Sequence, residues 1–219
     1  MSARGAVLVP GAPVLLEGLG GRTDPGAAVR AVAVTRLTAA LEAIRPDVVL
    51  VLAADPVVRD WTGTPFSVGR FLGTAQASDP HLPTALGVGQ ALLAAAGWTG
   101  EVRSVTTDGT GPDDAGLGAA DLVVVVGDGS PLRRSGGPDR PDPRAPEVDD
   151  RVRAAVAAGD TAALRDLDPG LARELMITGA PAWRRLAAWV GDAAVRAELD
   201  YADDPFGVFM IIAGWRWTT

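Results

Sequence analysis

Up to residue 130, apolar residues occur either in short uninterrupted runs or in longer stretches where they recur every three or four positions. The short runs predict buried strands over residues 6–9, 48–52, 102–105 and 122–126. The longer stretches predict helices over residues 27–44 and 84–96. Because strands and helices alternate, the pattern predicts an α/β fold, with a layered sheet whose N-terminal strands are parallel and flanked by helices.

The second half of the chain has a different pattern. It predicts helices over residues 147–158, 161–167, 169–176 and 182–190, with Asp160 and Asp168 as N-caps of the second and third. Two apolar segments, 195–201 and 208–217, flank a turn-rich break and predict a C-terminal β-hairpin.

The remaining segments are predicted to be loops within one domain. Residues 55–83 are expected to be loop with at most one short strand near 66–71. Residues 135–146, rich in Gly, Pro, Asp and Arg, are expected to form an exposed loop. With no internal repeat, residues 1–219 are expected to form a single domain.

Composition narrows the possible chemistry and partners. The chain lacks cysteine and has one histidine, His81, which excludes thiolate and multi-histidine metal sites. Its 27 acidic residues outnumber its 20 basic ones, all of them arginine, and no basic tract occurs, so nucleic acid is not an expected partner. No targeting signal and no long apolar segment is evident, so we expect a cytoplasmic protein that does not enter the membrane.

Residues just after the predicted parallel strands are the candidate site, because ligands bind beyond the carboxyl ends of such strands. Asp108 follows one of these strands. The residues expected to line the cleft are Gly11, Asp55, Gly127, Asp128, Gly129 and Ser130. The Gly127–Ser130 run offers backbone N–H groups to an anion, but it lacks the lysine and the glycine spacing of a phosphate loop.

Three residues are candidate catalytic groups: Asp55, Asp128 and His81. Converging carboxylates suit acid–base catalysis or a divalent cation, and His81 suits a general base. Each also has a structural interpretation. An aspartate after a strand commonly fixes a turn or caps a helix, and a histidine in a proline-rich loop is often simply solvated.

Several segments together resemble the LigB-type class III extradiol ring-cleavage dioxygenases, in particular the short LigB-like proteins of actinobacteria. The matching segments are VLVPGAPVLL from Val7, LPTALGVGQALLAAAGWTG from Leu82, VVVVGDGSPLRRS from Val123, DPRAPEVDDRVRAAVAAGD from Asp142, and RAELDYADDPFGVFMIIAGW from Arg196. They extend over most of the chain in the same order as in the family.

The resemblance implies an Fe(II) held by two histidines and a glutamate, with a further histidine as acid–base catalyst, an arrangement whose open face admits a diol and oxygen. At the matching positions this sequence has Gly11, Ala54-Asp55, Pro131 after the Gly-Asp-x-Ser turn, and Ala182-Trp183, with Glu174 as a distant substitute for the glutamate. The resemblance therefore implies the fold without the iron ligands. The favoured hypothesis is a degenerate homologue, without cofactor, that binds a small molecule or a protein.

Two alternative functions stay open. One is an enzyme of another type that uses the strand-end aspartates. The other is a dioxygenase with an atypical site built from Asp55, Asp128 and His81, although such an oxygen-rich site suits Mg or Mn better than Fe. A homo-oligomer is also considered, because an exposed apolar strand over 208–212 would need covering, but an internal position in the sheet explains that composition equally well.

Overall fold

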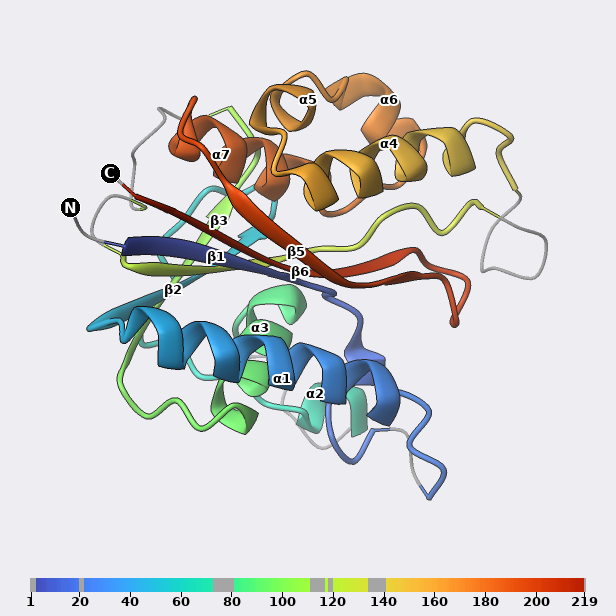
Figure 1. Ribbon diagram of the computed structural model, residues 1–219. Coiled ribbons are helices and arrows are strands. Elements are labelled where there is room, and N and C mark those ends of the chain that lie inside the picture. Colours follow the sequence, from blue (N-terminus) through green and yellow to red (C-terminus); the bar gives the residue numbers. More distant parts are fainter. Residues whose placement is uncertain are drawn as a thin grey trace.

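The computed structural model describes residues 3–19, 22–72, 81–110, 117, 120–133 and 141–218. In this part of the chain, six strands form one mixed sheet in the order β3-β2-β4-β1-β6-β5 (Figure 1). The strands are β1 (Ala3–Val9), β2 (Val48–Ala54), β3 (Glu101–Thr107), β4 (Leu122–Val126), β5 (Arg196–Asp203) and β6 (Met210–Thr218). The predicted α/β class, with parallel N-terminal strands and a C-terminal hairpin, is confirmed.

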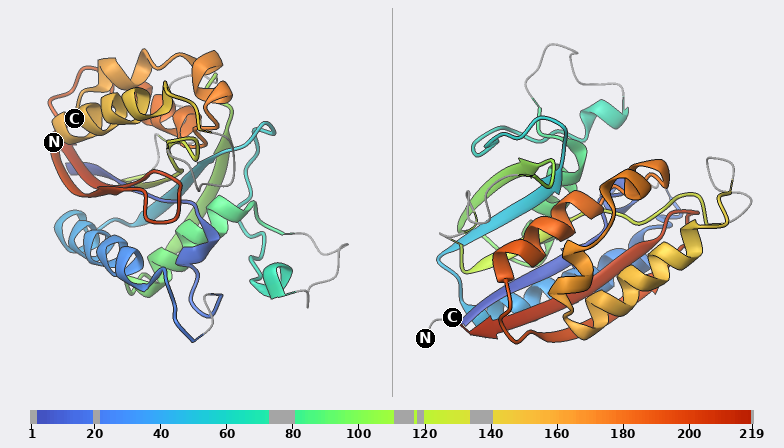
Figure 2. Two further views of the ribbon diagram at one scale, coloured as in Figure 1. Left: turned by 90° about the vertical axis from the view of Figure 1, so that its right-hand side faces the viewer. Right: turned by 90° about the horizontal axis from the view of Figure 1, so that it is seen from above.

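Helices cover both faces of the sheet (Figures 1 and 2). One layer contains α1 (Ala27–Ile44) and α3 (Thr84–Ala95), preceded by the short turn η1 (Pro13–Leu15) and by α2 (Gly69–Leu72). The other layer contains α4 (Ala145–Ala158), α5 (Thr161–Arg165), α6 (Pro169–Glu174) and α7 (Ala180–Val190).

The uninterrupted apolar runs form strands because both of their faces are buried. All five residues of β4 are fully buried between β1 and β2, both of which pair with it in parallel. Alternate residues of these strands enter two separate cores. Val123 and Val125 pack toward α4 and α7, whereas Val124 and Val126 pack toward α1 and α3. This two-sided burial explains why the run has no polar alternation.

The C-terminal hairpin extends the parallel sheet at its β1 edge. Strand β6 pairs antiparallel with both β1 and β5, so residues 208–212 lead into an internal strand. Of the two explanations considered for this apolar segment, the internal position in the sheet is therefore correct. The composition of the segment gives no reason to expect a second copy of the chain.

Two local predictions need correction and two are confirmed. The segment near 66–71 contains the short helix α2 rather than a strand. The expected loop over 135–146 lies partly outside the described residues, and its last two positions begin α4. The side chains of Asp160 and Asp168 accept the N–H groups of Ala163 and Leu171, each at 2.9 Å, and so cap α5 and α6.

No helix in the described ranges is long and apolar enough to cross a bilayer.

Candidate functional site

The carboxyl ends of the four parallel strands bring four candidate residues to the same level of the sheet. Ala53 is in register with Thr106 of β3 and with Val126 of β4, and Val126 is in register with Val9 of β1. Two residues further along each strand come Asp108, Asp55, Asp128 and Gly11, in that spatial order. We call these four residues the strand-end row.

Within this row, Asp128 is turned into the protein. Its side chain is largely buried, and both carboxylate oxygens lie 3.2 Å from the backbone nitrogen of Gly11, which donates to them. Burial raises the pKa of Asp128 to about 7, against the smaller opposing effect of the Gly11 hydrogen bond. Asp128 is thus an internal acid that connects the loops after β1 and β4.

The backbone of Asp128 also fixes the start of α7. Its N–H donates to Oγ1 of Thr178 at 3.1 Å, and its carbonyl accepts the N–H of Gly179 at 2.8 Å. The preceding Gly127 packs so closely there that an added Cβ would lie 2.3 Å from Cα of Gly179. Glycine is required at this contact because no side chain fits.

The Gly127–Ser130 run has no backbone donor available for an anion. The N–H groups of Gly127 and Gly129 donate to the carbonyls of Val9 and Phe209. That of Ser130 donates to the carboxylate of Asp149 at 3.1 Å. Because Ser130 is also fully buried, this run joins neighbouring elements rather than lining a cleft.

Asp55 and Asp108 instead border an open pocket of about 540 Å³ beyond the ends of β2 and β3, which we call the strand-end pocket. Its polar lining consists of Asp55, Thr107, Asp108, Arg173, Thr178 and Arg184. Its apolar lining consists of Ala54, Pro56, Pro169, Ala172, Met176, Ile177, Ala180 and Pro181. This volume lies within the range typical of small-molecule sites.

Each aspartate of the pocket uses one carboxylate oxygen in a local turn. Oδ1 of Asp55 accepts the N–H of Val57 at 2.8 Å. Oδ1 of Asp108 accepts the N–H of Thr110 at 2.8 Å and its hydroxyl at 2.7 Å, and these bonds lower the pKa of Asp108. The turn-forming role considered for Asp55 is therefore present, and a second oxygen of each carboxylate remains for other contacts.

Two arginines of the helical layer complete the pocket. Arg173 comes from the exposed side of α6, and Arg184 from the first half of α7. Nε of Arg184 donates to the carbonyl of Arg165 at 3.2 Å, which holds the stem of this side chain. Reasoning from strand ends did not find these residues, because helix packing rather than strand register brings them to the site.

The other candidate residues lie apart from the strand-end pocket. His81 is partly buried just before α3 and is not one of the pocket residues. Two further cavities are found: one of about 550 Å³ beside α4, α5 and α6, which shares Ala172, Ile177 and Ala180 with the strand-end pocket, and one of about 590 Å³ between α1 and α3. Neither contains a residue of the strand-end row.

The residues present do not fit the iron site that the family resemblance implies. Gly11 has no side chain, and a Cβ there would lie 3.4 Å from Oδ2 of Asp128. Trp183 is buried in the core, and Glu174 is exposed and paired with Arg144 at 2.9 Å. Among the residues that the structure describes, no three His, Asp or Glu side chains are grouped as metal ligands.

Comparison with known proteins assigns neither a family nor a function. No family model and no curated protein matches the sequence. Among solved structures, the chain is similar to the crystal structure of the uncharacterized protein JW3007 from Escherichia coli K12. That similarity has 14% sequence identity and a TM-score of 0.47, and covers 98% of this chain and all of the other.

Proposed function

We propose that this protein binds a small molecule in the strand-end pocket and does not carry out iron-dependent ring cleavage. The observation that carries the proposal is the pocket itself, which combines an apolar lining with two aspartates and two arginines beyond the ends of β2 and β3. Ligand sites are commonly concave and mostly apolar, with a few polar groups that fix the ligand's orientation.

The proposal treats the protein as a degenerate relative of the extradiol dioxygenases. Its support is the set of residues at the positions that the resemblance assigns to catalysis. Gly11 and Pro131 have no side chain that could bind a metal. Among the described residues, Asp55 is not part of any cluster of three or more His, Asp or Glu side chains that could hold a metal ion. The dioxygenase ancestry, a cytoplasmic location and a protein partner stay predictions.

A binding screen tests the proposal directly. We would record saturation-transfer NMR spectra of a diverse small-molecule library with the unmodified protein and with Pro56→Trp, whose indole is intended to fill the pocket from its exposed rim. The control is Val58→Trp, an exposed position two residues away that does not line the pocket. We expect compounds that bind the unmodified protein and Val58→Trp but not Pro56→Trp. If every bound compound is indifferent to Pro56→Trp, the pocket is not the binding site.

An anaerobic titration with Fe(II), with Mn(II) in parallel, tests the second half of the proposal. We expect no stoichiometric binding by the chelator-treated protein. Stoichiometric Fe(II) binding together with oxygen consumption on addition of a catechol would overturn it and restore the dioxygenase hypothesis.

A further inference from the structure

The strand-end pocket has an acidic wall made by two neighbouring strands. Ala54 and Thr107 form the last registered pair of β2 and β3, and the next residue on each strand is an aspartate. The N–H of Asp55 donates to the carbonyl of Thr107 at 3.0 Å, so this pairing continues into the aspartates themselves. Adjacent strands are about 5 Å apart, which places Asp55 and Asp108 side by side.

This wall has acceptor capacity for a cationic group. Within the described part of the chain, the turns occupy Oδ1 of each carboxylate and no hydrogen bond reaches either Oδ2. The lowered pKa of Asp108 keeps its carboxylate ionised at neutral pH. An ammonium group, which donates three hydrogen bonds, suits a wall of two adjacent carboxyl groups.

The helical side of the same pocket is basic. Arg184 donates through Nε to the carbonyl of Arg165, and its charge helps to lower the pKa of the nearby Asp168, but no described residue accepts a hydrogen bond from its two terminal nitrogens. Arg173 forms no ion pair with any residue in the described ranges. A guanidinium group presents paired N–H donors that match a carboxylate or phosphate.

The two charged walls do not neutralise each other. No ion pair within 4.0 Å joins Asp55 or Asp108 to Arg173 or Arg184 in the described structure. The lining of the same pocket includes the apolar residues Ala172, Ile177 and Ala180. The pocket therefore presents negative charge from the strand ends, positive charge from α6 and α7, and apolar surface, so a ligand with two opposite charges fits its lining.

We propose that the ligand is a dipolar molecule whose ammonium group binds Asp55 and Asp108, whose carboxylate binds Arg173 and Arg184, and whose apolar spacer crosses the pocket. This inference rests on the proposed small-molecule function and deepens it by naming the class of ligand. Since no ion pair within 4.0 Å joins the two walls, we expect a ligand whose two charges are held apart by a carbon spacer. The preferred ligand has a spacer of several carbons between the charges.

The test uses ω-amino acids from β-alanine to aminooctanoate, with hexylamine and hexanoate as the one-charge counterparts of aminohexanoate. Affinities are measured by isothermal titration calorimetry. We expect affinity to pass through a maximum along the series, and each one-charge counterpart to bind about tenfold or more weakly than the dipolar compound, because each loses one charged hydrogen-bonding end. Equal affinity for hexylamine and aminohexanoate would overturn the proposal.

Charge-removing variants assign each end of the ligand to its wall. Arg184→Gln is expected to weaken aminohexanoate and hexanoate by about tenfold and to leave hexylamine unchanged. Asp108→Asn keeps an Oδ1 acceptor for the Thr110 turn, and is expected to weaken aminohexanoate and hexylamine but not hexanoate. The same loss for all three compounds would contradict these assignments.

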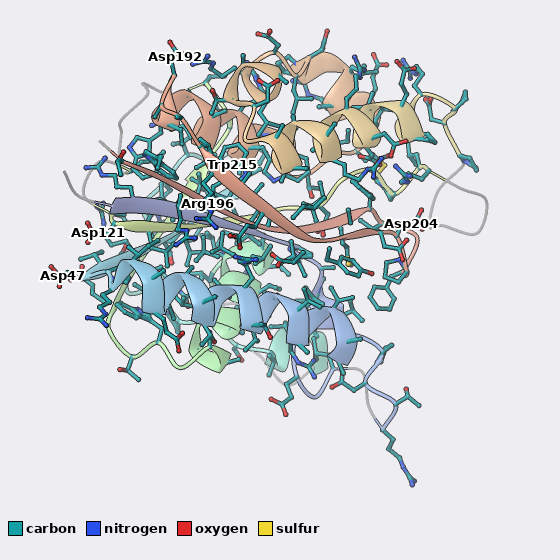
Figure 3. All side chains as sticks on the ribbon, viewed as in Figure 1. Asp47, Asp121, Asp192, Arg196, Asp204 and Trp215 are labelled. Carbon is teal, nitrogen blue, oxygen red and sulfur yellow. The ribbon has the colours of Figure 1, made fainter. Side chains whose placement is uncertain are left out.

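Matched controls lie elsewhere on the sheet and are labelled in Figure 3. Arg196→Gln removes an exposed arginine from β5, the edge strand opposite β3. Asp47→Asn removes an exposed aspartate just before β2, at the other end of the strand from Asp55. Both are expected to bind aminohexanoate normally.

Two further outcomes separate this inference from the function on which it rests. In the first, Pro56→Trp abolishes the binding of library compounds but no ω-amino acid binds the unmodified protein. That result would support the pocket as a binding site and overturn the dipolar ligand. Aminohexanoate binding that is abolished by a metal chelator would also overturn the proposal, because a cation would then stand between the carboxylates and the ligand.

Discussion

Replacing Asp128 by asparagine tests whether this buried carboxyl is protonated in the folded protein. Burial raises its pKa from the ordinary 3.8 to about 7. Between these two pKa values the folded state binds more protons at this site than the unfolded state does. The resulting stabilisation is therefore complete below pH ~4 and is lost as pH rises through about 7.

The size of the effect follows from the two pKa values. Applying the linkage relation to one carboxyl with these values gives a decline in unfolding free energy of about 3 kcal/mol from pH ~5 to pH ~8. The substituted asparagine would not titrate, and its side-chain oxygen would still accept the Gly11 N–H. The stability of Asp128→Asn relative to the unmodified protein is therefore expected to rise by about 3 kcal/mol over this interval.

Urea denaturation of both proteins at the two pH values measures this difference. Asp149, whose pKa burial raises to about 6, gives its own pH dependence, but it is present in both proteins and cancels in the comparison. The control Asp47→Asn replaces an exposed aspartate before β2 and shows how far a surface Asp-to-Asn change by itself alters stability at the two pH values. A difference for Asp128→Asn that stays constant within about 0.5 kcal/mol would refute a raised pKa at this position.

Three further changes test how the surrounding structure is held together. Gly127→Ala should destabilise the protein by about 2–3 kcal/mol in urea denaturation, because its Cβ would overlap the backbone of Gly179; a change below about 0.5 kcal/mol would contradict this packing. Trp215→Phe should lower stability by about 1–3 kcal/mol, because it leaves the carbonyl of Val156 without the indole donor at 2.9 Å; thermal denaturation matching the unmodified protein would be inconsistent with that bond. Asp160→Ala should cost about 1 kcal/mol through loss of the α5 N-cap, whereas Asp160→Asn should cost much less, and equal losses would exclude capping as the cause.

The parallel core could be predicted because its strands are buried on both faces. A run such as 122–126 has few other stable environments in a chain of this composition, and the intervening segments, with apolar residues every three or four positions, fit the crossover helices. The short helix α2 was not predicted because four residues are too few to show a helical period. Its local sequence does not distinguish a helical turn from a short strand.

The candidate site was only partly predictable for a related reason. Strand ends identified Asp55, because every parallel strand ends at the same edge of the sheet. Arg173 and Arg184 carry no comparable signal, because their approach depends on how α6 and α7 pack over that edge. The sequence also offered no means to separate a buried from an exposed strand-end aspartate, since the hydrogen bond from Gly11 to Asp128 joins residues that are 117 positions apart.

The strand-end row explains why the open site lies beside β2 and β3 rather than beside β1. At one end of the row, Gly11 has no side chain, so Asp128 turns toward its N–H and is enclosed. At the other end, Asp55 and Asp108 are held by their own turns and remain in contact with solvent. Because β4 lies between β1 and β2, the buried Asp128 separates Gly11 from Asp55. The row thus has an internal acid on its β4 side, whereas Asp55 and Asp108 line the strand-end pocket together with Arg173 and Arg184.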